Sequence, residues 1–177
     1  MVLRRSVGLL SVVVCLSGCA GTRTGADYAA VAQKVGPPRP GQSRIVVLEP
    51  KPSGALGLSY TVCEVQLDGS SIGRLKPGTY VYADRPAGRH HLLATEALFP
   101  DDSRLELSTE PGRTHFLLAK TSARHDTVTG MTVMGGIAGA VVGSVATAGG
   151  ENAGPVDFVQ LDEAAARTVM AELQLAE

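Results

Sequence analysis

The sequence predicts a mainly β fold class, a small antiparallel β-sandwich or a small barrel, between residues 44 and 122. Short runs in this stretch alternate polar and apolar side chains, as strands with one buried face do. Turn signals such as Asp-Gly and Pro-Gly separate the runs by about 8–12 residues, a spacing typical of sandwiches and barrels. A Gly-rich insertion, for which a helix is one interpretation, and a short C-terminal amphipathic helix complete the predicted fold.

The predicted strands follow one another with a turn after each. Alternation is clearest where Cys63, Val65 and Leu67 share one face, which we expect to line the core. Asp68-Gly69 then supplies the positive φ that a tight hairpin turn requires. We expect strands at residues 45–48, 61–67, 71–75, 79–82, 89–97, 104–108 and 114–120.

The residues from 155 to 177 predict one more strand and a helix. Residues 156–161 alternate like a strand, and Asp162 is a favourable N-cap for a helix that begins at Glu163. Spacings of three and four residues give this helix one apolar face. The face comprises Ala165, Ala166, Val169, Met170 and Leu173.

An uncharged, Gly-rich segment covers residues 127–150. Gly135, Gly139 and Gly143 recur every four residues, so on a helix they would line one face with bare backbone. Small residues at this spacing let helices pack closely in membranes. One interpretation is therefore a glycine-zipper helix that enters a bilayer or pairs with a second copy. A flexible loop and a helical hairpin packed on the β domain are the alternatives, since Gly costs about 1 kcal/mol in a helix interior.

The N-terminal segment is typical of an export signal. Arg4-Arg5 precede an apolar run that is too short to span a membrane as a helix. The run ends in Leu16, Ser17, Gly18 and Cys19, which together resemble the lipobox of bacterial lipoproteins. The resemblance implies cleavage before Cys19 and diacylation of that cysteine. Because Ala20 and not Asp follows, the resemblance also implies sorting to the outer membrane, with the protein facing the periplasm.

Five segments follow from these patterns. Residues 20–43 have Gly and Pro at both ends, which favours an extended, semi-stiff spacer. We therefore divide the chain into a signal peptide (1–18), a lipidated flexible tether (19–43), a β-sandwich domain (44–122), a glycine-zipper segment (127–150) and a C-terminal strand and helix (155–177).

Composition excludes several classes of function. Loss of residues 1–18 would leave 14 of the 16 basic side chains against 17 acidic ones, so no basic footprint for nucleic acid is expected. Tryptophan is absent, which disfavours a stacking platform for sugars or bases.

With Cys15 removed and Cys19 lipidated, Cys63 has no disulfide partner. Cys63 is then either a buried small hydrophobe or a free thiol.

No residue pattern predicts catalysis, a metal or a cofactor. His90 and His91 are neighbours on a strand and point to opposite faces, so both cannot bind one metal ion. We interpret these two, His115 and His125 as solvated residues at strand ends, and Asp101-Asp102 as a solvated loop. Because Cys63 shares the predicted core face, we expect its thiol to be inert.

Several of these turn and core residues together resemble a domain of unknown function, numbered 2846, that is common in bacterial lipoproteins. The resemblance covers about residues 43–120. It implies a β fold in an envelope lipoprotein and offers no catalytic residues. It rests on Leu67-Asp68-Gly69, Ile72-Gly73, Leu75, Gly78-Thr79-Tyr80, Pro86-Ala87-Gly88-Arg89-His90 and Leu92.

The leading functional hypothesis is a non-enzymatic outer-membrane lipoprotein, anchored through lipid on Cys19. Its β domain would act as an interaction or structural module in the periplasm, and its glycine segment would self-associate or contact the membrane. A module that binds a small envelope ligand or a peptidoglycan fragment is the alternative. A metal-dependent or cysteine enzyme is a third hypothesis, for which the sequence offers least.

Overall fold

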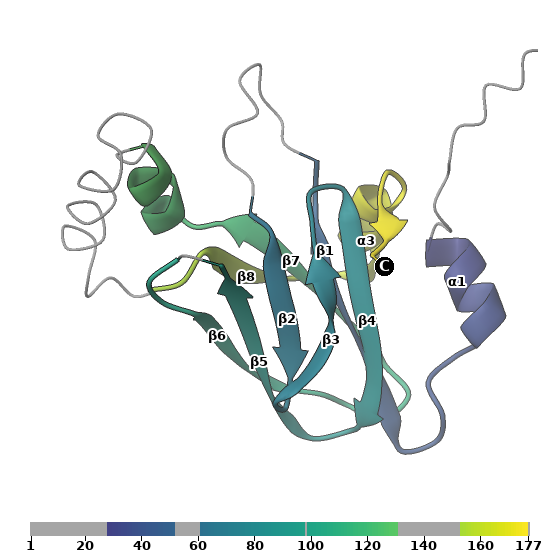
Figure 1. Cartoon of the computed structure of the whole chain (residues 1–177). Helices are drawn as coiled ribbons and strands as arrows, with labels where there is room; N and C mark the ends of the chain where they lie inside the picture. The colour runs from purple at the N-terminus through teal and green to yellow at the C-terminus, as the bar shows by residue number, and fades with distance from the viewer. Residues whose placement is uncertain (1–27, 52–60, 98, 131–152, 177) are drawn as a thin grey trace, which may run out of the picture.

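The computed structural model describes residues 28–51, 61–97, 99–130 and 153–176. Their strands form two sheets that lie face to face (Figure 1). The strand order is β8-β7-β1-β4-β9 in the five-stranded sheet and β3-β2-β5-β6 in the four-stranded sheet. The predicted mainly β sandwich is therefore confirmed.

The order of the elements agrees with the predicted strands and includes three further elements. The structure adds an N-terminal helix and a short last strand, and residues 123–130 form a further helix. The elements are α1 (Tyr28–Val35), β1 (Gln42–Glu49), β2 (Cys63–Leu67), β3 (Ser70–Leu75), β4 (Thr79–Pro86), β5 (Arg89–Glu96), β6 (Ser103–Ser108), β7 (Thr114–Thr121), β8 (Val156–Leu161), α3 (Glu163–Met170) and β9 (Gln174–Leu175).

The main core lies between the two sheets. Cys63, Val65 and Leu67 are fully buried there, as their alternation predicts. The hairpin after them also matches the prediction, because Asp68 and Gly69 have φ values of 52° and 76°. The strand pattern of the sequence thus places the inner face of β2 correctly.

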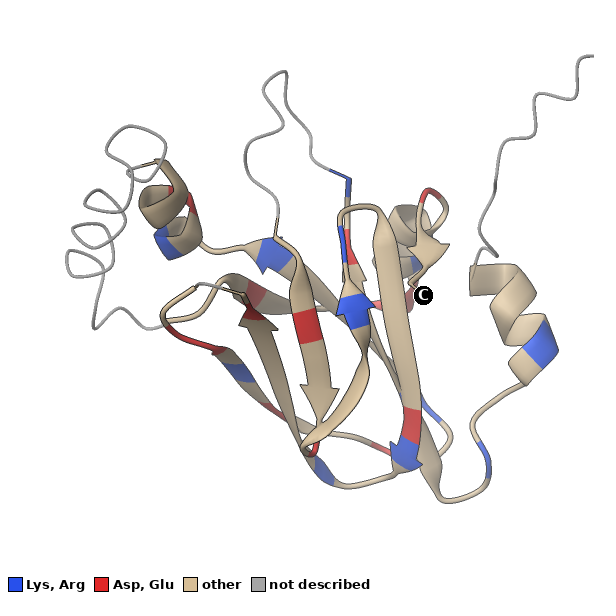
Figure 2. Ribbon diagram, viewed as in Figure 1, with Lys and Arg blue, Asp and Glu red and all other residues tan. Residues whose placement is uncertain are grey.

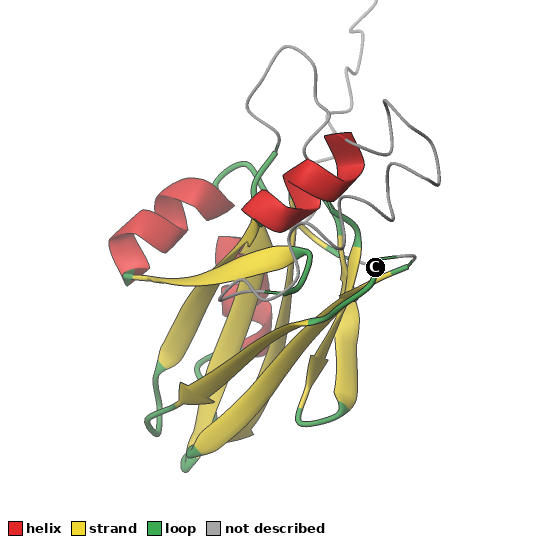
Figure 3. Ribbon diagram, turned by 90° about the vertical axis from the view of Figure 1, so that its left-hand side faces the viewer, coloured by secondary structure: helices red, strands yellow, loops and turns green. Residues whose placement is uncertain are grey.

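A second apolar cluster covers the outer face of the five-stranded sheet. β1 is buried on both faces from Ser43 to Glu49, because its alternate side chains enter the main core and this outer cluster. The helices α1 and α3 cover that outer face, and Figure 3 shows the helices outside the space between the strand layers. The members of the outer cluster are Val31, Val46, Leu48, Tyr80, Phe116, Ala166, Met170 and Leu173.

Part of the predicted tether belongs to the folded domain. We predicted a spacer over residues 19–43, but α1 packs on the sheet and β1 begins at Gln42. The Tyr28 ring lies edge-on to the rings of Tyr80 and Phe116, with centroid distances of 6.4 and 5.6 Å. Apolar burial of Tyr28 and Val31 explains why this segment folds despite its flanking Gly and Pro residues.

The C-terminal region largely follows its prediction. The Asp162 side chain accepts a hydrogen bond from the Ala165 backbone N–H at 2.7 Å, which makes it the N-cap of α3. Ala166 and Met170 are buried, whereas Ala165 is exposed and does not belong to the apolar face. Residues beyond α3 form β9, which pairs with β4 in parallel.

Two pairings in the five-stranded sheet are parallel, namely β1 with β7 and β4 with β9. Antiparallel pairs join the neighbours β2–β3 and β5–β6, whereas the parallel pairs join strands that are distant in sequence. No helix in the described part of the chain is long and apolar enough to cross a membrane. Of the segment 127–150, only residues 127–130 are described, as the end of the helix that begins at residue 123.

Candidate functional site

The sandwich has two lateral edges, and one of them is sealed. At this edge β6 of one sheet lies beside β8 of the other. The buried Ser103 hydroxyl donates to the Val156 carbonyl at 2.6 Å and accepts from the Val156 N–H at 2.9 Å. A Cβ added at Gly154 would overlap the backbone nitrogen and hydroxyl of Ser103. The sheets therefore touch backbone to backbone along this edge.

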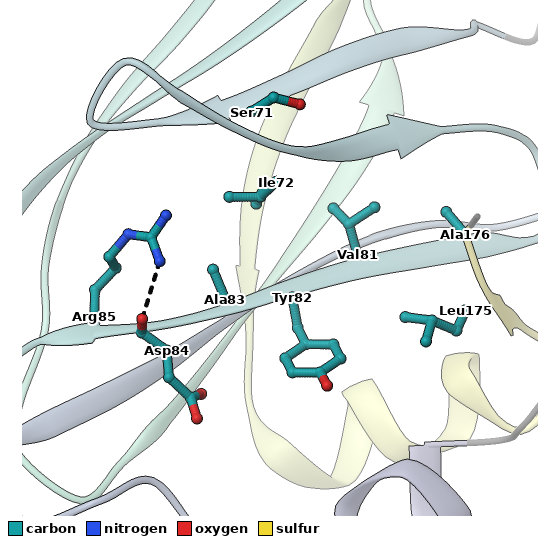
Figure 4. Close-up of a pocket in the computed structure, with 9 residues that line it drawn as sticks. All are labelled: Ser71, Ile72, Val81, Tyr82, Ala83, Asp84, Arg85, Leu175 and Ala176. Carbon is teal, nitrogen blue, oxygen red and sulfur yellow. Dashed lines mark hydrogen bonds between the residues drawn. The ribbon is translucent and has the colours of Figure 1, made fainter. Parts of the chain in front are cut away.

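The opposite edge, between β3 and β4, is open. A groove of about 530 Å³ runs along it, as Figure 4 shows. Its walls combine apolar side chains from β3, β4 and the chain after α3 with polar groups, and a charged pair of residues lies at the far end of β4. The lining residues are Ser71, Ile72, Val81, Tyr82, Ala83, Asp84, Arg85, Leu175 and Ala176.

A glycine sets how closely β3 approaches β4 beside this groove. Gly73 has a φ of 139°, and a Cβ there would lie 2.8 Å from Cγ1 of Val81. The β2–β3 register shifts between Val65 and Gln66, directly opposite this point. The irregularity lets β3 cross over β4 at Gly73, while Ile72 next to it faces the groove.

On β4, the backbone N–H and C=O groups of the even-numbered residues point away from β1, toward the groove. The carbonyls of Gly78 and Tyr80 accept hydrogen bonds from the N–H groups of Gln174 and Ala176, at 3.0 and 2.9 Å. Because strand residues alternate in direction, Tyr82, Asp84 and Pro86 face the same side. Side chains cap two of them: Arg85 Nη1 donates to the Asp84 carbonyl at 3.0 Å, and His90 Nε2 contacts the Pro86 carbonyl at 2.9 Å.

Of the two charged residues at the end of the groove, Asp84 has an ion-pair partner and Arg85 has none in the described part of the chain. Asp84 accepts two hydrogen bonds from the Arg44 guanidinium, at 2.7 and 2.8 Å, and Arg44 also donates to the Gly36 carbonyl. Hydrogen bonding to Asp84 raises the pKa of Arg44, although burial opposes this shift. Among the described residues, no carboxylate lies within ion-pair distance of Arg85. Figure 2 shows the adjacent acidic and basic bands near the end of β4.

His90 ties the two turns below the groove together. Its Nδ1 lies 2.7 Å from Asp68 Oδ2, and Asp68 Oδ1 accepts from the His91 N–H at 2.9 Å. Desolvation raises the pKa of Asp68, but the hydrogen bonds from His91 and His90 outweigh it and lower that pKa overall. The contact joins the β2–β3 turn to the end of β4, so it fixes the lower end of the groove.

A separate polar cluster lies at the end of the sandwich where β1 ends and β2 begins. Glu49 is 4% exposed, and its Oε1 accepts from the N–H and hydroxyl of Thr61 at 3.3 and 3.2 Å. No described group donates to Glu49 Oε2. Burial raises the pKa of Glu49 to about 7 against the effect of the Thr61 hydrogen bonds. This carboxyl group therefore titrates near neutral pH.

The neighbours of Glu49 hold the helix of residues 123–130 on the sandwich. His125 Nε2 lies 3.0 Å from Glu96 Oε2, and the His125 ring stacks on Phe99 at a centroid distance of 5.4 Å. Arg124 pairs with Asp101 at 2.6 Å. These contacts place polar groups from β1, β5 and the helix around one buried end.

The burial of two histidines corrects their sequence-based interpretation, and the burial of Cys63 supports another. His90 and His125 are 5% and 4% exposed, so they are not solvated strand-end histidines. Their carboxylate partners, Asp68 in the β2–β3 turn and Glu96 on β5, come from other elements, which the pattern within one element cannot reveal. Cys63 is buried as expected, and burial raises the pKa of its thiol to about 12. In the described ranges, no group of three or more His, Cys, Asp or Glu residues could hold a metal ion.

The site residues predicted from the sequence lie outside the described residues. These are the lipobox residues Leu16, Ser17, Gly18 and Cys19, and the helix-packing residues Gly135, Gly139 and Gly143. The groove could not be predicted from the sequence, because β3 and β4 follow one another along the chain but lie in different sheets. The only local signals were Ile72-Gly73, where a bulky and a bare residue adjoin, and the Asp84-Arg85 pair.

The comparisons with known proteins agree with this fold. No curated protein matches the chain. The family model described as Protein of unknown function (DUF2846) matches residues 39–132, which is more than half of the chain. This range begins just before β1 and runs past β7, so it includes the β3 and β4 residues of the groove but not Leu175 and Ala176. The chain therefore belongs to the DUF2846 family, as its turn and core residues predict.

Proposed function

We propose that this chain is a non-enzymatic lipoprotein of the bacterial outer membrane whose β-sandwich binds a protein partner in the periplasm. The observation that carries the interaction part is the open groove between β3 and β4. The opposite edge is closed by Ser103 and Gly154, so an open edge is not a general consequence of this sandwich. Natural sheets usually cover or block such an edge, and an apolar groove beside one is a common place for a partner to bind.

The polar chemistry of the domain favours binding over catalysis. Cys63 is the one thiol in the described residues, and its raised pKa keeps it protonated at neutral pH. A catalytic thiol needs the opposite shift, because the thiolate is the nucleophile. In the groove, Ile72 and Leu175 offer apolar contact area, and the one carboxylate of the lining, Asp84, is already held by both hydrogen bonds from Arg44.

The anchor rests on the lipobox pattern that ends in Cys19. Two or three acyl chains, each CH₂ contributing about 0.8 kcal/mol, hold a protein stably on a bilayer, whereas one chain does not. The spacer between Cys19 and α1 is then short. The sandwich would lie close to the membrane surface.

Metabolic labelling with an alkyne fatty acid tests the anchor. The wild-type chain and a Cys15→Ser variant should carry the label, and Cys19→Ser should not. Cys15→Ser is the matched control because it removes a cysteine of the same segment. Label that persists in Cys19→Ser, or that is absent from the wild type, would contradict the anchor.

Site-specific photo-crosslinking in intact cells tests the interaction module. A photoreactive side chain at position 72 faces the groove, and one at position 104 lies exposed on β6 near the sealed edge. We expect a discrete adduct with one partner from position 72 and none from position 104, with the partner residue identified by mass spectrometry. Equal adducts from both positions, or none, would refute the assignment of the groove.

Self-association through the glycine segment is a second proposed role. The four-residue spacing of Gly135, Gly139 and Gly143 favours it. Light scattering of the non-lipidated chain should then show oligomers, and replacing all three glycines by leucine should yield monomers. A monomeric wild-type chain at micromolar concentration would exclude this role.

A further inference from the structure

We propose that the β3–β4 groove binds an extended peptide segment that adds as a strand to β4 and carries an acidic group opposite Arg85. The inference rests on the proposed interaction function and specifies the chemistry of the partner. Three features of the described residues support it: unpaired backbone on β4, apolar side chains beside that backbone, and a guanidinium that has no carboxylate within ion-pair distance, although it interacts with Asp68 over a longer distance.

The first feature is a short stretch of β4 backbone that nothing in the described residues pairs with. The carbonyls of Gly78 and Tyr80 bind the chain after α3, and the carbonyls of Asp84 and Pro86 are capped by Arg85 and His90. Between these caps, alternation leaves the N–H and C=O of Tyr82 and the N–H of Asp84 facing the groove. These groups can form ladder hydrogen bonds with about two residues of an added strand.

The second feature is the apolar mouth of the sandwich beside this backbone. Val81 and Ala83 belong to the main core, and Ile72 packs against the same core from β3 while remaining partly accessible. In Figure 4 the side chains of Ile72 and Val81 lie between the two strands that bound the groove. A bulky apolar side chain of an added strand would enter between the sheets at this point. Its burial would supply the main driving force for binding.

The third feature is the charge of Arg85. Asp84 is already neutralised by the buried Arg44, and Asp68 is engaged by His90. Arg85 donates one N–H to the backbone carbonyl of Asp84, and no carboxylate among the described residues lies within ion-pair distance of it. A guanidinium in this position can bind a carboxylate through its remaining donors. This selects an acidic side chain or a terminal carboxylate at that end of the peptide.

The chain itself supplies a precedent for the binding mode. β9 adds to the same edge of β4, pairing Gln174 with Thr79 and Leu175 with Tyr80. Leu175 and Ala176 then form one wall of the groove. The proposed site is therefore the continuation of a strand interface that the fold already uses. A flat surface would offer no such continuation.

Fluorescence anisotropy with two synthetic peptides tests the proposal on the full chain. The probes are fluorescein-labelled Thr-Val-Thr-Leu-Thr-Glu and the matched peptide that ends in Lys. We expect saturable binding of the Glu peptide and about tenfold weaker binding of the Lys peptide. Arg85→Gln should abolish this preference, and Ile72→Asp should abolish binding. Arg104→Gln on β6 is the control cation and should change neither result.

Hydrogen exchange locates the bound peptide. The amides of Tyr82 and Asp84 should exchange rapidly in the free chain and gain protection with the Glu peptide. Binding without protection at these amides, or equal binding of both peptides, overturns the inference. If position 72 crosslinks to a partner but neither peptide binds, strand addition is wrong while the interaction function stands. Crosslinks between two copies through position 72 would replace the peptide by a second copy of this chain.

Discussion

The two lateral edges of this sandwich solve the same physical problem in different ways. Edge strands leave backbone groups unpaired, and proteins must cover or block them to avoid unwanted pairing. At the β6–β8 edge, Ser103 bonds to the backbone of the opposing strand and closes the gap. At the β3–β4 edge, β9, Arg85 and His90 each cap part of the strand and leave a groove between them.

Only a short part of the open edge has backbone groups that are free to pair. A fully exposed β4 would offer hydrogen bonds along its whole length and could pair with any extended chain. With both ends capped, only the stretch around Tyr82 remains available. Because few backbone groups are open and Arg85 places a charge beside them, the edge favours selective recognition over general strand pairing.

The largest loss of stability should come from a substitution at the sealed edge. Gly154→Ala places a Cβ on the backbone of Ser103, where no flexible side chain can move away. We expect a loss of about 3 kcal/mol or more in the free energy of unfolding, because overpacking forces backbone shifts. Urea denaturation followed by circular dichroism measures it.

Gly130→Ala is the control for this variant. Gly130 lies in the 123–130 helix, and a Cβ there meets nothing within 4 Å. Alanine in a helix is neutral or stabilising by up to about 1 kcal/mol. Equal behaviour of the two variants would show that the sealed edge is looser than its contacts indicate.

Sequence reasoning predicted the strands because their signals are local. Alternation in Cys63, Val65 and Leu67 and the turn at Asp68-Gly69 depend on neighbours within a few residues. The same reasoning could not predict β9, which has two residues and forms only because the edge of β4 is available. It also assigned α1 to a spacer, because the residues that hold this helix on the sheet, Tyr80 and Phe116, are distant in sequence.

The candidate site was less predictable for the same reason. The groove exists because β3 crosses β4 near Gly73, and that crossing depends on the pairing of two separate sheets. The polar cluster joins Glu49, Glu96 and His125, each of which alone reads as a surface residue. A buried charge becomes recognisable only when its partner from another strand is known.

A second test concerns the buried end of the sandwich, where Glu49 should make the stability of the chain depend on pH. An unfolded Glu49 titrates near 4.5, whereas the folded residue titrates at about 7. Between these values the folded chain holds a proton that the unfolded chain lacks, so the free energy of unfolding falls as pH rises. The fall amounts to at most about 3 kcal/mol. Glu96, His125 and the Cys63 thiol are the other titratable groups at this end.

Glu49→Gln should remove this pH dependence. Glutamine keeps an oxygen to accept from Thr61 and carries no charge. We expect unfolding free energies close to wild type at pH 5 and higher than wild type at pH 8, measured by urea titration. Glu106→Gln, at an exposed position on β6, should leave the wild-type dependence in place. Parallel pH curves for wild type and Glu49→Gln would contradict the raised pKa.

The smallest effect should come from the lower end of the open edge. The pKa of Asp68 is lowered in the folded chain, so its stabilisation is present above 3.8 and is lost as pH falls through the folded pKa. Asp68→Asn keeps a residue that tolerates the φ of 52°. Because the side chain is 38% exposed, solvent screening limits the expected loss to about 1 kcal/mol at pH 7.

Asp102→Asn supplies the matched comparison near the sealed edge. Asp102 pairs with the exposed Arg104 at 3.6 Å, so its loss should cost less than about 0.5 kcal/mol at any pH. If Asp68→Asn also changes the protection from hydrogen exchange that the Glu peptide gives to the Asp84 amide, the His90 contact is what limits the open stretch of β4. If it changes neither stability nor exchange, Arg85 alone blocks that end, and the length of an added strand is set by one side chain.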